Sequence, residues 1–265
     1  MTQPSSNPAS EMAIAHVNIA LSGIEFETQV PVPKKPVPTR IMLPVVRAFT
    51  GAILNASEKM VRDMGRTASC KPACGACCRQ LVPIALSETY ELRRLVEQMP
   101  EPRRALIQER FAYIVRKLQA KGMAEKLREP GRHGEQEIDE LSDQYFSLQM
   151  ACPFLEEESC SIYPDRPIIC REYLVTSDPE FCKNPTKETI QPLPIAARAS
   201  AALMHLDDAP EKPYLQWIPL TLALEWAEKN PEPPPRAGTD LLGQFLECLG
   251  KDPESPIPPA MRGDR

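Results

Sequence analysis

Residues 70–80 read CKPACGACCRQ, and no other stretch of the sequence is as informative. It places four thiols within nine residues, those of Cys70, Cys74, Cys77 and Cys78. Packing does not explain such a density, whereas a tight turn can aim several thiolates at one metal ion or iron–sulfur cluster. A second group follows, formed by Cys152, Cys160, Cys170 and Cys182. The two groups together predict a metal-binding protein.

The spacing within the groups leaves the number of metal sites open. The first group is C-x3-C-x2-C-C and the second is C-x7-C-x9-C-x11-C, with about seventy residues between them. Adjacent side chains such as those of Cys77 and Cys78 point about 100° apart on a helix, or to opposite faces of a strand. The eight thiols therefore complete either two four-sulfur sites or one cluster, with the remaining thiols in redox or outer-shell roles. A helical hairpin is the simplest way to bring the groups together.

Zinc and an iron–sulfur cluster are both compatible with an all-cysteine ligand set. Neither the paired C-x2-C knuckles of zinc sites nor the ferredoxin run C-x2-C-x2-C-x3-C-P is present. The C-x3-C-x2-C spacing at Cys70, Cys74 and Cys77 also occurs in radical S-adenosylmethionine enzymes. Here, however, Ala76 replaces their usual aromatic residue, and no strand–helix alternation predicts a βα barrel.

Composition and charge indicate the cellular compartment in which we expect the protein. The chain has 265 residues and a net charge of −5, so it lacks the electrostatic footprint of a nucleic-acid-binding protein. No apolar run approaches the roughly 18 residues needed to span a bilayer, and the N-terminus lacks the basic region of a secretory signal. We therefore expect a cytoplasmic protein without membrane contact. Thiols stay reduced in the cytoplasm, which makes a disulfide framework the weaker interpretation.

Hydrophobic periodicity predicts a mainly α fold, a small irregular helical domain organised around the cysteine-ligated metal site. Helices are expected at 43–66, where Gly65 can end the helix, at 87–99 with Ser87 as N-cap, and at 102–127, 138–149, 195–205, 214–229 and 239–250. The 30 prolines concentrate near both ends. We predict a disordered proline-rich tail at 1–40, a single helical domain at 41–250 with a cysteine core at 70–182, and a disordered tail at 251–265.

Several blocks resemble one known family. CKPACGACCRQ, CPFL, CSIYPDRPIICREY and then Cys182 are similar, in this order, to the CxxCxxCC (YkgJ-type) cysteine-cluster family, described as a zinc- or iron-chelating domain. The resemblance covers about residues 70–182 and implies metal-binding roles for all eight grouped cysteines. The family pattern has two residues between its first cysteines, and this chain has three. A related branch contains bacterial lysine N-methylases that act on flagellin and carry an iron–sulfur cluster.

Three functions follow as hypotheses. The chain is a non-catalytic metalloprotein holding zinc or a cluster, an iron–sulfur-dependent methylase-like enzyme, or a carrier that passes metal or cluster to a protein partner. Arg166 and Arg171 either offset the charge of a thiolate site, hold an anion, or form turn salt bridges. Tyr163 and Tyr173 either donate hydrogen bonds to sulfur or belong to the core. The ninth cysteine, Cys248, is expected to be a small buried hydrophobe of the last helix.

Overall fold

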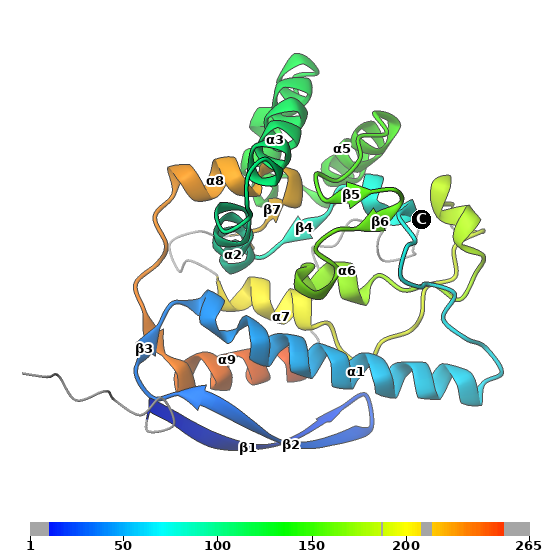
Figure 1. The fold of residues 1–265 in the computed structure, drawn as a ribbon. Helices are drawn as coiled ribbons and strands as arrows, with labels where there is room; N and C mark the ends of the chain where they lie inside the picture. The colour runs from blue at the N-terminus through cyan, green and yellow to red at the C-terminus, as the bar shows by residue number, and fades with distance from the viewer. Residues whose placement is uncertain (1–10, 187, 208–213, 252–265) are drawn as a thin grey trace, which may run out of the picture.

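The computed structural model describes residues 11–186, 188–207 and 214–251, and it is mainly helical, as predicted (Figure 1). The α-helices are α1 (Leu43–Asp63), α2 (Leu86–Glu97), α3 (Arg103–Ala120), α4 (Ala124–Arg128), α5 (Glu135–Ser147), α6 (Ile168–Glu172), α7 (Ala199–Leu206), α8 (Ala223–Lys229) and α9 (Gly238–Gly250). Short 3-10 helices are η2 (Thr39–Met42), η3 (Ala76–Arg79), η4 (Pro130–Arg132), η5 (Tyr163–Asp165), η6 (Pro179–Lys183) and η7 (Leu220–Leu222). Within the described residues, no helix is long and apolar enough to cross a lipid bilayer.

Strands occur in antiparallel pairs. They are β1 (Met12–Leu21) with β2 (Ile24–Pro33), β3 (Pro36–Val37) with β8 (Arg236–Ala237), β4 (Pro83–Ile84) with β7 (Ile218–Pro219), and β5 (Leu155–Glu156) with β6 (Ser159–Cys160). Apart from β1 and β2, each of these strands has two residues, and each pair joins two segments of the chain. The β3–β8 and β4–β7 pairs tie the N-terminal part of the chain to its C-terminal part.

The prediction of a disordered tail at 1–40 is wrong for residues 11–40. Strands β1 and β2 form a ten-residue hairpin closed by Ser22 and Gly23, whose φ values are 48° and 80°. Two central residues with positive φ give the type I′ turn that matches strand twist. Val17 and Leu21 face the core from β1, and Val32 does so from β2. Residues 1–10 and, from 252 on, the predicted tail 251–265 lie outside the described residues.

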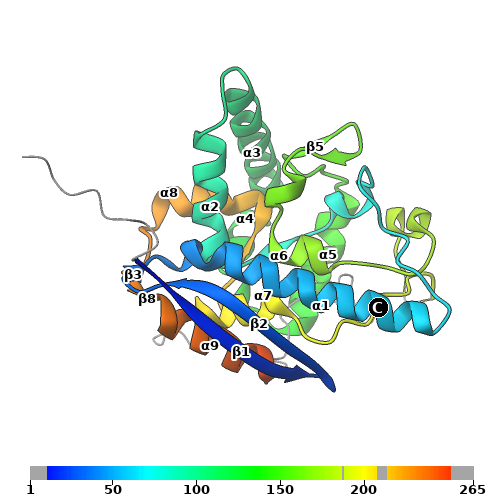
Figure 2. The ribbon, with the colours of Figure 1, turned by 60° about the horizontal axis from the view of Figure 1, so that its bottom comes forward.

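Two layers enclose the main core. The hairpin lies across α1 and α9, and α7 packs on the other side of α9 (Figures 1 and 2). Phe49 of α1 and Phe245 of α9 meet there with ring centroids 5.9 Å apart. A second hydrophobic cluster involves α2, α3, η7 and α6, and it includes Phe111 against Phe154. This second cluster carries most of the cysteine region.

Helix ends follow local chemistry more closely than the predicted bounds. Gly65, with φ of 77°, ends α1 as expected, because the N–H of Arg66 reaches the carbonyl of Val61 in a Schellman motif. The single helix expected at 102–127 is instead divided into α3 and α4, since Gly122 (φ 69°) forms the same motif with the Met123 N–H on Leu118. The expected N-cap Ser87 lies inside α2, which begins one residue earlier.

Candidate metal centre

The first cysteine group lies in a tight loop after α1. Gly75 precedes η3, the short helix that holds Cys77 and Cys78. A side chain on Gly75 would meet the Leu155 Cδ1 atom at 2.6 Å and the Glu158 carbonyl oxygen at 2.9 Å, distances that require movement of the hairpin β5–β6. Arg79 also holds this loop against the hairpin β5–β6. Its Nη1 donates to the Gly75 carbonyl at 3.2 Å, and its Nη2 lies 2.5 Å from Glu158 Oε1. The loop therefore needs glycine at this position.

Replacing Gly75 by alanine is expected to lower the free energy of unfolding by about 1–3 kcal/mol, because the added methyl overpacks the contact with β5–β6. Urea denaturation of the metal-free, reduced protein measures this change. The matched control is Gly243→Ala in α9, where no atom lies within 4 Å of the added methyl. That variant should be neutral or more stable, since alanine favours a helix interior by up to about 1 kcal/mol. An equally stable Gly75→Ala protein would contradict the assigned role.

Backbone hydrogen bonds bring the two cysteine groups together. The Cys152 N–H donates to the Cys78 carbonyl at 2.7 Å, across the segment that contains α2 to α5. The Ser69 N–H donates to the Val175 carbonyl at 2.9 Å, and the Val175 N–H donates to Cys70 Sγ at 3.4 Å. The first group thus lies between two parts of the second (Figure 1).

Buried carboxylates fix the helix that carries Cys170. Glu88 of α2 accepts the N–H of Ile168, the first residue of α6, at 2.8 Å, and the N–H of Ala85 at 3.0 Å. Glu172, at the other end of α6, accepts the N–H of Ser200 in α7 at 3.1 Å. Burial raises the pKa of both carboxyls to about 7, although these hydrogen bonds oppose the rise. Buried carboxylates therefore anchor both ends of the short helix α6, one end to α2 and the other to α7.

Seven of the eight grouped cysteines line one cavity of about 260 Å³, and the exception is Cys182. Cys182 instead packs with Cys70 and Cys74 against Val175 and Ile190. All nine cysteines of the chain lie in its described part, and none forms a disulfide. Cys248 lies apart from both groups, on α9 beside the main core. The structure therefore gathers the eight residues that the sequence grouped.

The thiols that influence one another's pKa fall into two neighbourhoods. Burial and the neighbouring thiols of Cys70 and Cys74 raise the pKa of Cys182 to about 11. Burial also raises the pKa of Cys170, with contributions from three nearby thiols, those of Cys152, Cys78 and Cys160. One neighbourhood thus surrounds Cys182, and the other surrounds Cys170.

Cys77 and Cys78 lie where the two neighbourhoods meet. The Cys77 thiol donates a hydrogen bond to Cys78, which raises the pKa of Cys77 and lowers that of Cys78. Cys77 is also close enough to interact with both Cys170 and Cys70. Cys77 and Cys78 are adjacent on η3, and the side chains of adjacent residues point in different directions. The pair therefore lies next to both neighbourhoods.

The donor set fits a thiophilic metal in its chemistry. Among the described residues, no three cysteine, histidine, aspartate or glutamate side chains already converge as metal ligands. Ligation therefore requires the thiols to rotate toward common points. Reduced, largely buried cysteines around one cavity are suitable ligands for zinc or iron, both of which accept sulfur donors. Cys70 already accepts a backbone hydrogen bond of the kind that supports a thiolate ligand.

The flanking arginines and tyrosines have distinct positions. Arg166 stacks on the Tyr163 ring, with its guanidinium carbon 4.0 Å from the ring centroid. Arg171 donates to the carbonyls of Pro164 and Arg166. Within the described chain neither arginine forms an ion pair, so the turn salt bridges proposed for them are absent. Tyr173 is buried in the second cluster and its hydroxyl accepts from Gln80 Nε2 at 3.4 Å, which supports a core position.

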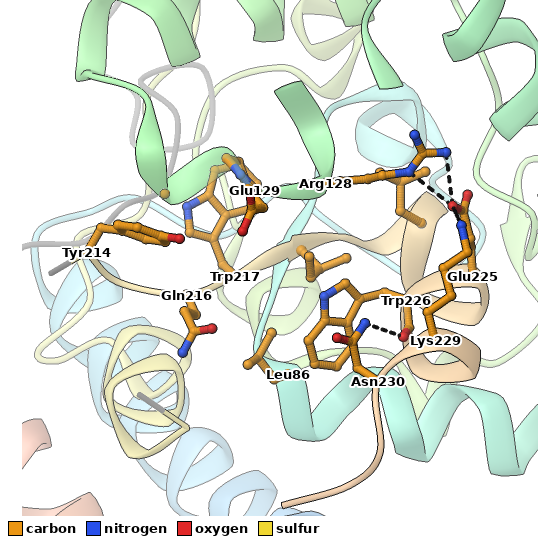
Figure 3. Close-up of a pocket in the computed structure, with 14 residues that line it drawn as sticks. Leu86, Arg128, Glu129, Tyr214, Gln216, Trp217, Glu225, Trp226, Lys229 and Asn230 are labelled. Carbon is orange, nitrogen blue, oxygen red and sulfur yellow. Dashed lines mark hydrogen bonds and ion pairs between the residues drawn. The ribbon is translucent and has the colours of Figure 1, made fainter. Parts of the chain in front are cut away.

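A second cavity, of about 310 Å³, lies between η4, β7 and α8 and is lined by Trp217 and Trp226 (Figure 3). It contains no cysteine. Its charged side chains neutralise one another, because Glu225 Oε1 lies 2.9 Å from Arg128 Nη2 and 2.5 Å from Lys229 Nζ. Seven of the eight grouped cysteines line the other cavity, and none of them lines this one.

Comparison with known proteins agrees with this location. The family model CxxCxxCC, described as "Putative zinc- or iron-chelating domain", matches residues 69–189, somewhat less than half of the chain. No curated protein and no solved structure matches the chain. The matched range begins at Ser69, which hydrogen-bonds Val175, and it includes all eight grouped cysteines. The match supports a zinc- or iron-chelating function and leaves the identity of the metal open.

Proposed function

We propose that this protein binds metal through two sets of four cysteines. The first set is Cys70, Cys74, Cys77 and Cys182, and the second is Cys78, Cys152, Cys160 and Cys170. The observation that carries the proposal is the gathering of seven of these thiols around one cavity, with the eighth packed against two of them. Cys77 is assigned to the first set because the second already has four mutually close thiols.

The proposed ligands are compatible with zinc or with an iron–sulfur cluster. Zinc would supply a structural cross-link between segments, whereas a cluster would supply electron transfer. The cross-linked segments are short: η3, β6, α6 and η6 have between two and five residues each. Elements of this length bury little surface of their own, which supports a metal held permanently for stability. This argument favours a resident metal over a carried one.

The test is to measure zinc, iron and acid-labile sulfide in protein purified without oxygen, together with its visible spectrum. Iron together with acid-labile sulfide, and absorption at about 400 nm from sulfur-to-iron charge transfer, would assign iron–sulfur clusters. Two zinc ions per chain without colour would assign two structural zinc sites. A protein that holds neither metal, and that takes up none when reduced and titrated, would contradict the proposal.

Metal uptake should release protons. Burial raises the pKa of Cys70, Cys152, Cys160 and Cys170, so these thiols hold their protons at pH 7 in the metal-free protein. Only the thiolate binds metal, and we expect release of roughly three to four protons per zinc ion at pH 7. The affinity for zinc should consequently rise as the pH rises. Calorimetric titration in two buffers of different ionisation enthalpy counts the protons, and identical heats in both would contradict this expectation.

A further inference from the structure

Arg166 forms no ion pair within the part of the chain that the structure describes. It lines the cysteine cavity, and its Nε atom is buried with no hydrogen-bond partner in the described part of the chain. Glu58 is the carboxylate that lines the same cavity, and it makes no ion pair with Arg166. A buried N–H donor without a hydrogen-bond partner is unfavourable, because folding removes its water and supplies no acceptor in return. The Nε–H of Arg166 therefore calls for an acceptor in the cysteine cavity that the described residues do not supply.

The turn that carries Arg166 is held by contacts to its backbone and to Asp165, and the guanidinium rests on one aromatic ring. Its aromatic support is Tyr163, whose ring lies under the guanidinium carbon. Arg171 donates to the carbonyl of Arg166 at 3.3 Å and to that of Pro164. The Arg47 side chain of α1 donates to Asp165 Oδ1 at 3.3 Å and to the Asp165 carbonyl oxygen at 3.2 Å. The turn that carries Arg166 is thus fixed against both α1 and α6 before any metal binds.

The cation is close to thiols of both proposed sets. Arg166 lines the same cavity as Cys70, Cys78 and Cys160. Cys70 belongs to the first set, and Cys78 and Cys160 to the second. A single guanidinium therefore faces both groups of ligands.

We propose that Arg166 is a positioning residue for the metal centre, whose guanidinium offsets the negative charge of the thiolate ligands and hydrogen-bonds to their sulfur atoms. This inference rests on the proposed function. A divalent ion with four thiolates carries a net charge of minus two, and two such sites around one cavity repel each other. A cation fixed between them reduces this repulsion and satisfies its own buried Nε. Arginine is suited to the role because its charge is permanent and its planar group stacks on tyrosine.

The test compares metal affinity in matched variants. Zn²⁺ affinity is measured by competition with a chelator, and Co²⁺ titration follows the thiolate-to-cobalt absorption. Arg166→Gln should bind Zn²⁺ about 10–100-fold more weakly than the wild type, the range expected when a partner of a metal ligand is removed. Arg166→Lys keeps the charge but loses the planar group, and we expect an intermediate affinity. The control is Arg132→Gln, which also removes an arginine over a tyrosine ring, that of Tyr214, on an exposed surface. It should leave the affinity unchanged.

Several outcomes overturn the inference. Arg166→Gln with wild-type affinity would do so, and it would leave the proposed function intact because the metal still binds. A wild-type affinity that falls in added inorganic phosphate, with Arg166→Gln insensitive to phosphate, would show that Arg166 serves a soluble anion instead. If Arg166→Gln fails to fold, Arg166→Lys decides: wild-type affinity in this folded variant, together with an unchanged Co²⁺ spectrum, overturns the sulfur hydrogen bonds. Failure of the wild type to bind metal overturns the proposed function itself.

Discussion

In protein loaded with zinc, replacing Cys170 by serine is expected to remove one of the two ions that the proposed ligand sets would hold, and to leave the other in place. Cys170 is the centre of the second proposed set, where the thiols of Cys78, Cys152 and Cys160 surround it. Serine preserves the size of the side chain but offers a hydroxyl that stays protonated at neutral pH and is a poor ligand for zinc. Zinc content after dialysis, together with Co²⁺ titration, measures the loss.

The companion variant Cys74→Ser should remove the other ion, because Cys74 belongs to the first set beside Cys182. The double variant should then hold none. Cys248→Ser is the matched control, since this cysteine lies on α9 beside the main core, away from both sets. Full zinc content in Cys74→Ser and Cys170→Ser would contradict the ligand assignment. Loss of both ions in either single variant would instead indicate one shared centre.

The second large effect concerns pH. Burial raises the pKa of Glu88 to about 7 from the usual value of 4.5. Between these two pH values the folded protein keeps a proton that the unfolded chain has lost, so the unfolding free energy falls as the pH rises. A shift of this size corresponds to about 3 kcal/mol, fully present below pH 4.5 and lost once the pH exceeds about 7. Glu172 and Asp207 have raised pKa values for the same reason and act in the same direction.

Glu88→Gln isolates this effect, because glutamine cannot lose a proton and keeps an oxygen for the Ile168 N–H. The difference in unfolding free energy between wild type and variant should change by about 3 kcal/mol from pH 4.5 to pH 7, in favour of the variant at the higher pH. Urea denaturation of the metal-free, reduced proteins gives the difference. The control Glu91→Gln, on the same helix, should show no such change, since Arg94 lowers the pKa of Glu91. A pH-independent difference for Glu88→Gln would contradict the assignment.

Local signals predicted much of the helical fold. The apolar period of α1 and its glycine stop were visible in the sequence, and the structure confirms them. The hairpin β1–β2 was missed because its prolines indicated a tail. In a two-stranded ribbon each strand has one side without a pairing strand, so Pro31 and Pro33 are tolerated there. The turn residues Ser22 and Gly23, between alternating apolar stretches, were the signal that indicated the hairpin.

The site could be predicted only as a set of residues. Short spacing identified the eight cysteines, but it does not reveal which thiols lie together. The proposed division into two sets depends on the Cys152–Cys78 hydrogen bond and on the anchoring of α6 by Glu88, whose partner Ile168 is 80 residues away. Contacts between residues so far apart in the sequence produce no periodic pattern that a single sequence would reveal. Gly75 carried a local hint as a turn glycine, while its close approach to Leu155 depends on the tertiary structure.

The pairing of β3 with β8, and of the hairpin with α9, has a consequence for synthesis on the ribosome. The β3–β8 pair joins Pro36 to Ala237, so it forms only after some two hundred further residues have been made, which takes on the order of 10–40 s at ordinary rates of synthesis. The cysteine segment emerges well before that. Metal can therefore reach a nascent chain whose outer layers are still open, and loading would precede the closing of the hydrophobic core.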